Sequence, residues 1–108
     1  MSARSEYDAA YFTLLRALEE RDDLLRYRDW LVVERERLDT FGDETRNRTD
    51  ALPRRVRRAM ESTTRPLLEA VGRRRSAVLD EQRRIDDRIA AAEGFVSECQ
   101  AEVDRLRP

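Results

Sequence analysis

A seven-residue repeat near the C-terminus constrains the fold of this chain more than any other feature. Apolar residues recur there at alternating intervals of four and three residues, at Ile85, Ile89, Ala92, Val96, Cys99, Val103 and Leu106. Three heptads with this spacing are typical of a coiled-coil seam. The register extends back through Val78, Val71 and Leu68, with Gln82 and Arg75 as polar interruptions. The pattern predicts a long helix over 66–107.

A second helical stripe occupies the N-terminal part of the chain. Tyr7, Tyr11, Leu14 and Leu18 follow the 4-3-4 spacing that places residues on one face of a helix. The stripe then shifts by one position and continues through Leu24, Tyr27, Leu31, Leu38 and Phe41. Such a shift changes supercoiling locally without ending a helix. The sequence therefore predicts a first long helix over 5–46.

Two breaks are predicted between the long helices. Polar turn formers gather at 47–53, and Pro53 disfavours helical geometry at the residue before it. Asp50 is then placed to cap a short basic helix over 51–62.

The second predicted break is at 62–66. Pro66 suits the first turn of a helix, with Thr63 or Thr64 as the capping residue. The alternative is one continuous helix that is kinked near Thr63.

Two long amphipathic helices joined by a short broken segment bury their stripes by folding back on each other. The predicted fold is therefore an all-α, antiparallel helical hairpin that forms one domain over 1–108. Residues 30–33 (Trp-Leu-Val-Val) are apolar in every direction, so we expect more than one side of this stretch to be covered. Self-association into a homodimeric four-helix bundle would cover it. The candidate helix–helix interface comprises Leu24, Trp30, Leu31, Leu38, Phe41, Ile85, Ile89, Val96, Cys99, Val103 and Leu106.

The charges are segregated along the chain although the net charge is −1. All 22 basic residues are arginine, against 23 acidic residues. Residues 1–45 hold 7 Arg and 12 acidic residues (−5), 46–75 hold 10 and 3 (+7), and 76–108 hold 5 and 8 (−3). The candidate contacts for an anion or a partner are Arg54, Arg55, Arg57, Arg58, Arg73, Arg74 and Arg75. The competing interpretation is that these arginines only pair with acidic residues of the segments 1–45 and 76–108.

Composition argues against catalysis and metal binding. The chain has no His, which is the commonest general base and metal ligand, and its single cysteine, Cys99, cannot form an intrachain disulfide. Carboxylate neighbours such as Asp22 and Asp23 lack the Gly-containing loop of an EF-hand. We expect no enzyme activity, no cofactor and no membrane span, and we expect a cytoplasmic location.

Two stretches carry a resemblance to a known group of proteins. One is Val32-Val33-Glu34-Arg35-Glu36-Arg37-Leu38-Asp39-Thr40-Phe41, and the other is Val56-Arg57-Arg58-Ala59-Met60-Glu61-Ser62-Thr63. With the closing helix, they resemble an uncharacterised haloarchaeal group of small, Arg- and Glu-rich helical proteins. That resemblance implies a coiled-coil fold and a habitat, and it implies no activity.

These observations predict a non-enzymatic coiled-coil interaction protein, such as a small adaptor, a regulatory protein or an assembly component. The alternative is an electrostatic nucleic-acid-binding protein that uses the Arg-rich bend at 54–75.

Overall fold

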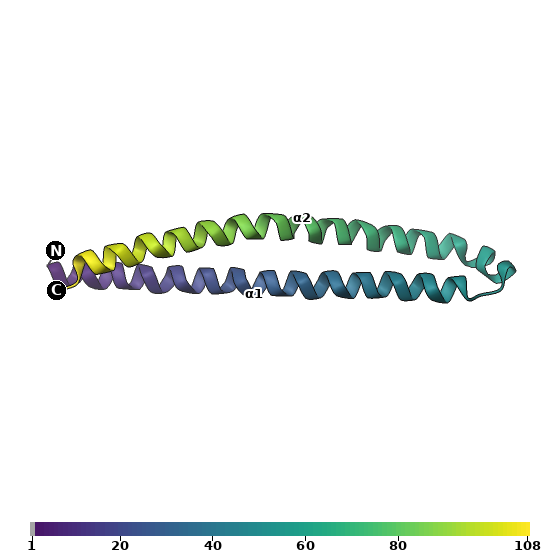
Figure 1. The fold of residues 1–108 in the computed structure, drawn as a ribbon, viewed down its shortest axis with the longest axis horizontal. Helices are drawn as coiled ribbons and strands as arrows, with labels where there is room; N and C mark the ends of the chain where they lie inside the picture. The colour runs from purple at the N-terminus through teal and green to yellow at the C-terminus, as the bar shows by residue number, and fades with distance from the viewer. Residues whose placement is uncertain (1) are drawn as a thin grey trace. The chain divides into compact units, whose positions relative to one another are not determined.

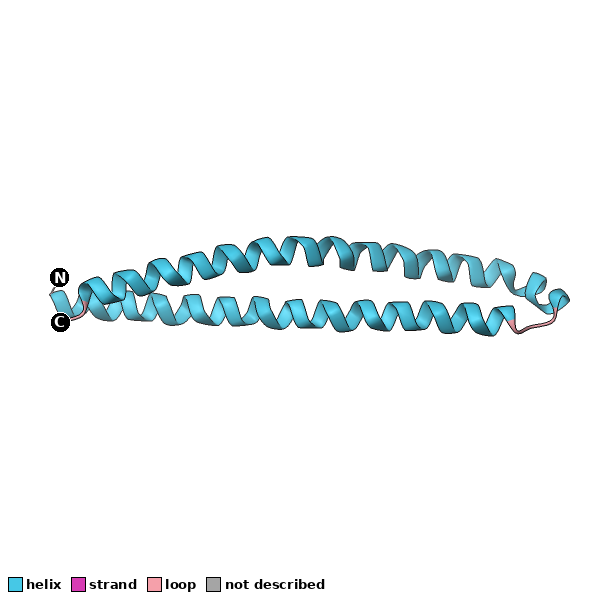
Figure 2. Cartoon of the chain, in the orientation of Figure 1, coloured by secondary structure: helices cyan, strands magenta, loops and turns pink. Residues whose placement is uncertain are grey.

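The computed structural model describes residues 2–108, which form two helices (Figure 1). Helix α1 is Ala3–Asp50 and helix α2 is Arg54–Leu106. Residues 51–53 join them in a short turn, and no strand occurs in residues 2–108 (Figure 2). The predicted all-α helical hairpin is confirmed.

Helix α1 continues past its predicted end at 46 and includes Asp50. Asp50 is therefore the last residue of α1, and the prediction that it caps the next helix is wrong. The polar residues at 47–50 are tolerated because the Thr49 hydroxyl donates to the Thr45 carbonyl (2.8 Å), which leaves the helical backbone intact. The Ala51 amide still donates to the Asn47 carbonyl (3.1 Å), which completes the last turn.

Helix α2 has no break at 62–66, so the short separate helix predicted over 51–62 does not occur. The continuous alternative is the one that the structure adopts, and Pro66 lies inside the helix. Proline removes one backbone donor, and an ion pair from Arg65, within the predicted break, reaches back to Glu61 in the preceding turn (2.7 Å). Thr64 and Leu68 are half-buried, so packing begins within the same stretch.

The contacts within the chain define two units, which are described separately. The first unit combines the residues up to Asp29 with Arg83–Pro108, and the second is Trp30–Gln82. In the first unit, Leu14 and Ala17 of α1 form a buried cluster with Cys99 and Val103 of α2. Both chain termini lie at one end of this unit (Figure 1).

The second unit contains the turn and the halves of α1 and α2 that flank it. Its buried apolar residues are Leu31, which is 1% exposed, and Val78, which is 5% exposed. The core of this unit is therefore a narrow line of side chains, and much of each helix faces solvent.

Candidate interaction surfaces

The predicted interface residues separate into buried and exposed groups. Six are buried, namely Leu24, Leu31, Ile85, Ile89, Cys99 and Val103. Three are half-buried, namely Leu38, Val96 and Leu106. Trp30 and Phe41 are 50% and 44% exposed, so they do not belong to the intrachain seam.

Helical geometry explains why Phe41 lies outside the seam. The seven-residue series of Leu24, Leu31 and Leu38 continues to Thr45, and Gly42 rather than Phe41 is buried beside it. A Cβ atom at Gly42 would lie 3.8 Å from Cγ1 of Val71, an ordinary contact distance, so Gly42 faces α2. Phe41 was predicted in the seam because it is apolar, whereas the seam keeps the seven-residue periodicity.

The buried carboxylate of Glu34 was not predicted. Glu34 is 7% exposed, and its Oε1 accepts a hydrogen bond from Nε of Arg74 across the two helices (3.0 Å). A guanidinium nitrogen of Arg37 lies 3.7 Å from the other carboxylate oxygen. Arg75 likewise donates to Asp39 across the helices. For Arg74 and Arg75, therefore, the interpretation that surplus arginines pair with acidic residues holds.

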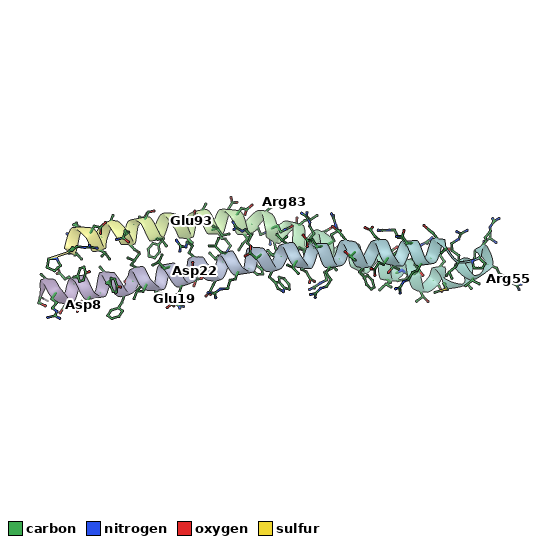
Figure 3. The ribbon with its side chains drawn as sticks, turned by 60° about the horizontal axis from the view of Figure 1, so that its bottom comes forward. Asp8, Glu19, Asp22, Arg55, Arg83 and Glu93 are labelled. Atoms are coloured by element: carbon green, nitrogen blue, oxygen red, sulfur yellow. The ribbon has the colours of Figure 1, made fainter. Side chains whose placement is uncertain are left out.

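The arginines at the start of α2 behave differently. Arg54, Arg55, Arg57 and Arg58 are all exposed, and their guanidinium groups form no hydrogen bond or ion pair with any residue from 2 to 108. Arg55 extends outward near the beginning of α2 (Figure 3). Arg73 is also exposed and has no ion pair within the described residues.

A hollow of about 630 Å³ lies beside these arginines. Arg54, Arg57, Arg58 and Arg65 line it from α2, and Thr49 lines it from α1. Three of these arginines were predicted as candidate contacts, and Arg65 was not. The signal for Arg65 was its helical spacing of seven residues from Arg58, which becomes visible only when α2 is continuous.

A second hollow lies in the first unit and was not predicted. It has a volume of about 450 Å³ and is lined by Phe12 of α1 and Phe95 of α2, together with small and polar side chains. Phe12 is 67% exposed and Phe95 is 50% exposed. The acidic residues Glu19 and Asp22 of α1 and Glu93 of α2 belong to this unit (Figure 3).

The pKa values of Glu102 and Arg105, at the C-terminal end of α2, differ from their ordinary values. Arg105 donates hydrogen bonds to Glu102, and these bonds hold the pKa of the Glu102 carboxyl below its ordinary value. The same hydrogen bonds raise the pKa of Arg105. Both groups are exposed, so the pair is a surface interaction of α2 rather than a reactive site.

Residues 2–108 contain no group of three or more His, Cys, Asp or Glu side chains that could hold a metal ion. Neither α1 nor α2 has an apolar stretch with the length that crossing a bilayer requires.

Comparison with models of protein families, with curated proteins and with solved structures found no match to this chain. The arguments about function therefore depend on the two surfaces described above, which are the unpaired arginines of α2 and the exposed apolar residues of α1.

Proposed function

We propose that this chain is a non-enzymatic interaction protein that acts through helix–helix contacts and pairs with a second copy of itself. The observation that carries the proposal is the exposure of the apolar stretch 30–33. Leu31 is 1% exposed, whereas Trp30, Val32 and Val33 are 50%, 41% and 52% exposed. A single chain thus covers one side of a stretch that is apolar on all sides.

The exposed residues form a surface on α1 that we call the Trp30 face, consisting of Trp30, Val33 and Phe41. They are three and eight residues apart, and Arg37 occupies the intervening turn. Residues with this spacing lie on one side of a helix, and that side points away from Leu31. Large apolar side chains grouped in this way are typical of a surface that packs against another protein.

The exposed area of the chain supports a second copy as the occupant. The chain exposes 8197 Å², whereas a monomeric globular protein of 12.8 kDa exposes about 6,300 Å². The excess of about 1,900 Å² is larger than the roughly 800 Å² that each partner buries in an interface of standard size. Homodimerisation would bury much of this excess without any other component.

The test is the mass of the protein in solution, measured by size-exclusion chromatography with light scattering across a range of concentrations. The wild type should have the mass of a dimer. Val33→Glu places a charge in the Trp30 face and should shift the mass to that of a monomer. Ser76→Glu places the same charge at an exposed position of α2, outside the face, and it should leave the dimer intact.

Circular dichroism of each variant checks that the helices persist. A wild-type mass that stays monomeric at every concentration would overturn the proposal. The same conclusion follows if Val33→Glu and Ser76→Glu behave alike.

The broader role follows from the same proposal. A helical dimer that acts through helix–helix contacts suits an adaptor, a regulatory protein or an assembly component. Membership of the haloarchaeal group stays a prediction, as does the cytoplasmic location, in which a reduced lone cysteine such as Cys99 is ordinary.

A further inference from the structure

The first turns of α2 are uncovered on every side. All residues from Pro53 to Thr63 are exposed, and Thr64 is the first half-buried residue of the helix. A segment that contributes so little to the core is free to carry residues for another purpose.

The positive charge of this segment does not stabilise the helix. Arg54 and Arg58 are four residues apart, and Arg54 and Arg57 are three apart, so like charges lie side by side on the helix surface. Within the hollow, the Glu61 carboxylate pairs with Arg65, while the guanidinium groups of the other three arginines have no acidic partner in residues 2–108. Glu69 also lines the hollow, so its four arginines and two glutamates leave a net charge of +2.

We propose that this hollow binds the phosphate backbone of double-stranded nucleic acid without sequence preference. The planar guanidinium group pairs bidentately with phosphate oxygens, and such charge-assisted bonds are about twice as strong as neutral ones. From Arg54 to Arg58, the three arginines without an acidic partner extend about 6 Å along the helix axis. This length corresponds to about two nucleotides of one strand at 3.4 Å each, so the array suits neighbouring phosphates of a polymer better than a single phosphate.

The side chains around the hollow favour the backbone over the bases. Residues 46–75 contain no aromatic side chain on which a base could stack. Affinity should therefore depend on the number of phosphates contacted and on the salt concentration.

The opposite side of the same segment argues against a lipid surface. Val56 and Met60 are the exposed apolar residues there, at 42% and 43%. Helical geometry places Val56 about 160° from Arg54 and Arg58 around the axis, and Met60 about 160° from Arg58 and about 120° from Arg54. A membrane that took up this apolar side would turn the hollow away from the lipid headgroups.

The experiment measures fluorescence anisotropy of a labelled 20-base-pair duplex titrated with the full chain at 50 mM and 200 mM salt. Three phosphate contacts predict an affinity about 40-fold weaker at the higher salt. The triple variant R54Q/R57Q/R58Q should abolish most of the binding at 50 mM salt. These residues are exposed, so circular dichroism should show unchanged helices.

The matched control is R16Q/R26Q/R107Q, which removes the same charge from exposed arginines that already pair with acidic neighbours. It should retain binding within about twofold of the wild type. The proposal is overturned by absence of duplex binding at 50 mM salt, or by equal losses in the two triple variants.

Two competition experiments test whether the hollow prefers the duplex to other polyanions. Vesicles of phosphatidylcholine with 30% phosphatidylserine, and polyglutamate of matched charge, are added as competitors of the labelled duplex. Weak competition by both supports the proposal. Competition as effective as that of unlabelled duplex would assign the hollow to a lipid surface or to an acidic protein, and would overturn it.

Discussion

Replacing Arg74 with methionine should destabilise the hairpin, because it leaves a buried carboxylate without its closest cation. The Glu34 side chain is 8% exposed, and Nε of Arg74 lies 3.0 Å from it. Removing one partner of a fully buried pair costs about 3–5 kcal/mol. Arg74 is itself 60% exposed, and Arg37 stays within 3.7 Å of the carboxylate, so solvent and the second cation reduce the cost. We expect a loss of about 1–2 kcal/mol in the free energy of unfolding.

Replacing Glu34 with methionine, by contrast, should leave the free energy of unfolding unchanged or raise it. The substitution removes the buried charge and fills the same volume with apolar atoms, and such replacements are often neutral or stabilising. Methionine and glutamate have similar helix propensities, so the backbone of α1 adds little to the difference. In the Glu34→Met background, Arg74→Met should cost less than about 0.5 kcal/mol, because no buried carboxylate is left to stabilise.

The assay is urea denaturation followed by circular dichroism at one fixed protein concentration, since dimerisation makes stability depend on concentration. Arg73→Met is the matched control, because Arg73 is an exposed neighbour without an ion pair in the described residues. It should change stability by less than about 0.5 kcal/mol. The reasoning is refuted if Arg73→Met and Arg74→Met cost the same, or if Glu34→Met destabilises as much as Arg74→Met.

Three further predictions concern α2. Gly94→Ala should raise the free energy of unfolding by about 0.5–1 kcal/mol in urea denaturation, since a Cβ there meets no atom within 4 Å and alanine favours the helix. Pro66→Ala should stabilise the chain by up to about 3 kcal/mol in the same assay, because it restores a backbone donor to the Ser62 carbonyl within a continuous helix; a loss of stability would contradict this. In an NMR titration Glu102 should have a pKa below 4.5, and Arg105→Gln should return it toward that value. The stabilisation from this pair is present at neutral pH and is lost as the pH falls through the folded-state pKa.

The periodic parts of the sequence predicted the helices well. The heptads of α2 reappear as buried Ile85, Ile89, Cys99 and Val103, because a repeat of three and four residues keeps one stripe against its neighbour. Single residues that indicate where a helix starts or ends were less reliable. Pro66 indicated a helix start, yet α2 continues through it at the cost of one backbone hydrogen bond.

The candidate surfaces could be predicted only in part, for a physical reason that differs at each position. Trp30 and Leu31 are adjacent and equally apolar, and only the position of α2 determines that one is buried and the other half-exposed. Arg58 and Arg74 are equally basic in sequence, and only the second has an acidic residue opposite it. Such differences depend on which residues of the two helices face each other, and no single-chain pattern contains that information.

The sequence by itself determined that the chain is helical, that it folds back on itself near Pro53, and that positive charge gathers around that bend. These properties depend on periodicity, on turn-forming residues and on charge counts, all of which are local. The tertiary structure alone decided which arginines are neutralised and which apolar residues stay uncovered. Neutralisation requires a carboxylate within about 4 Å, and Glu34 lies 40 residues from Arg74 in sequence, so only folding brings them together. The same folding leaves Arg54, Arg57 and Arg58 without such a partner in the described residues, and for that reason they are the positions to test first.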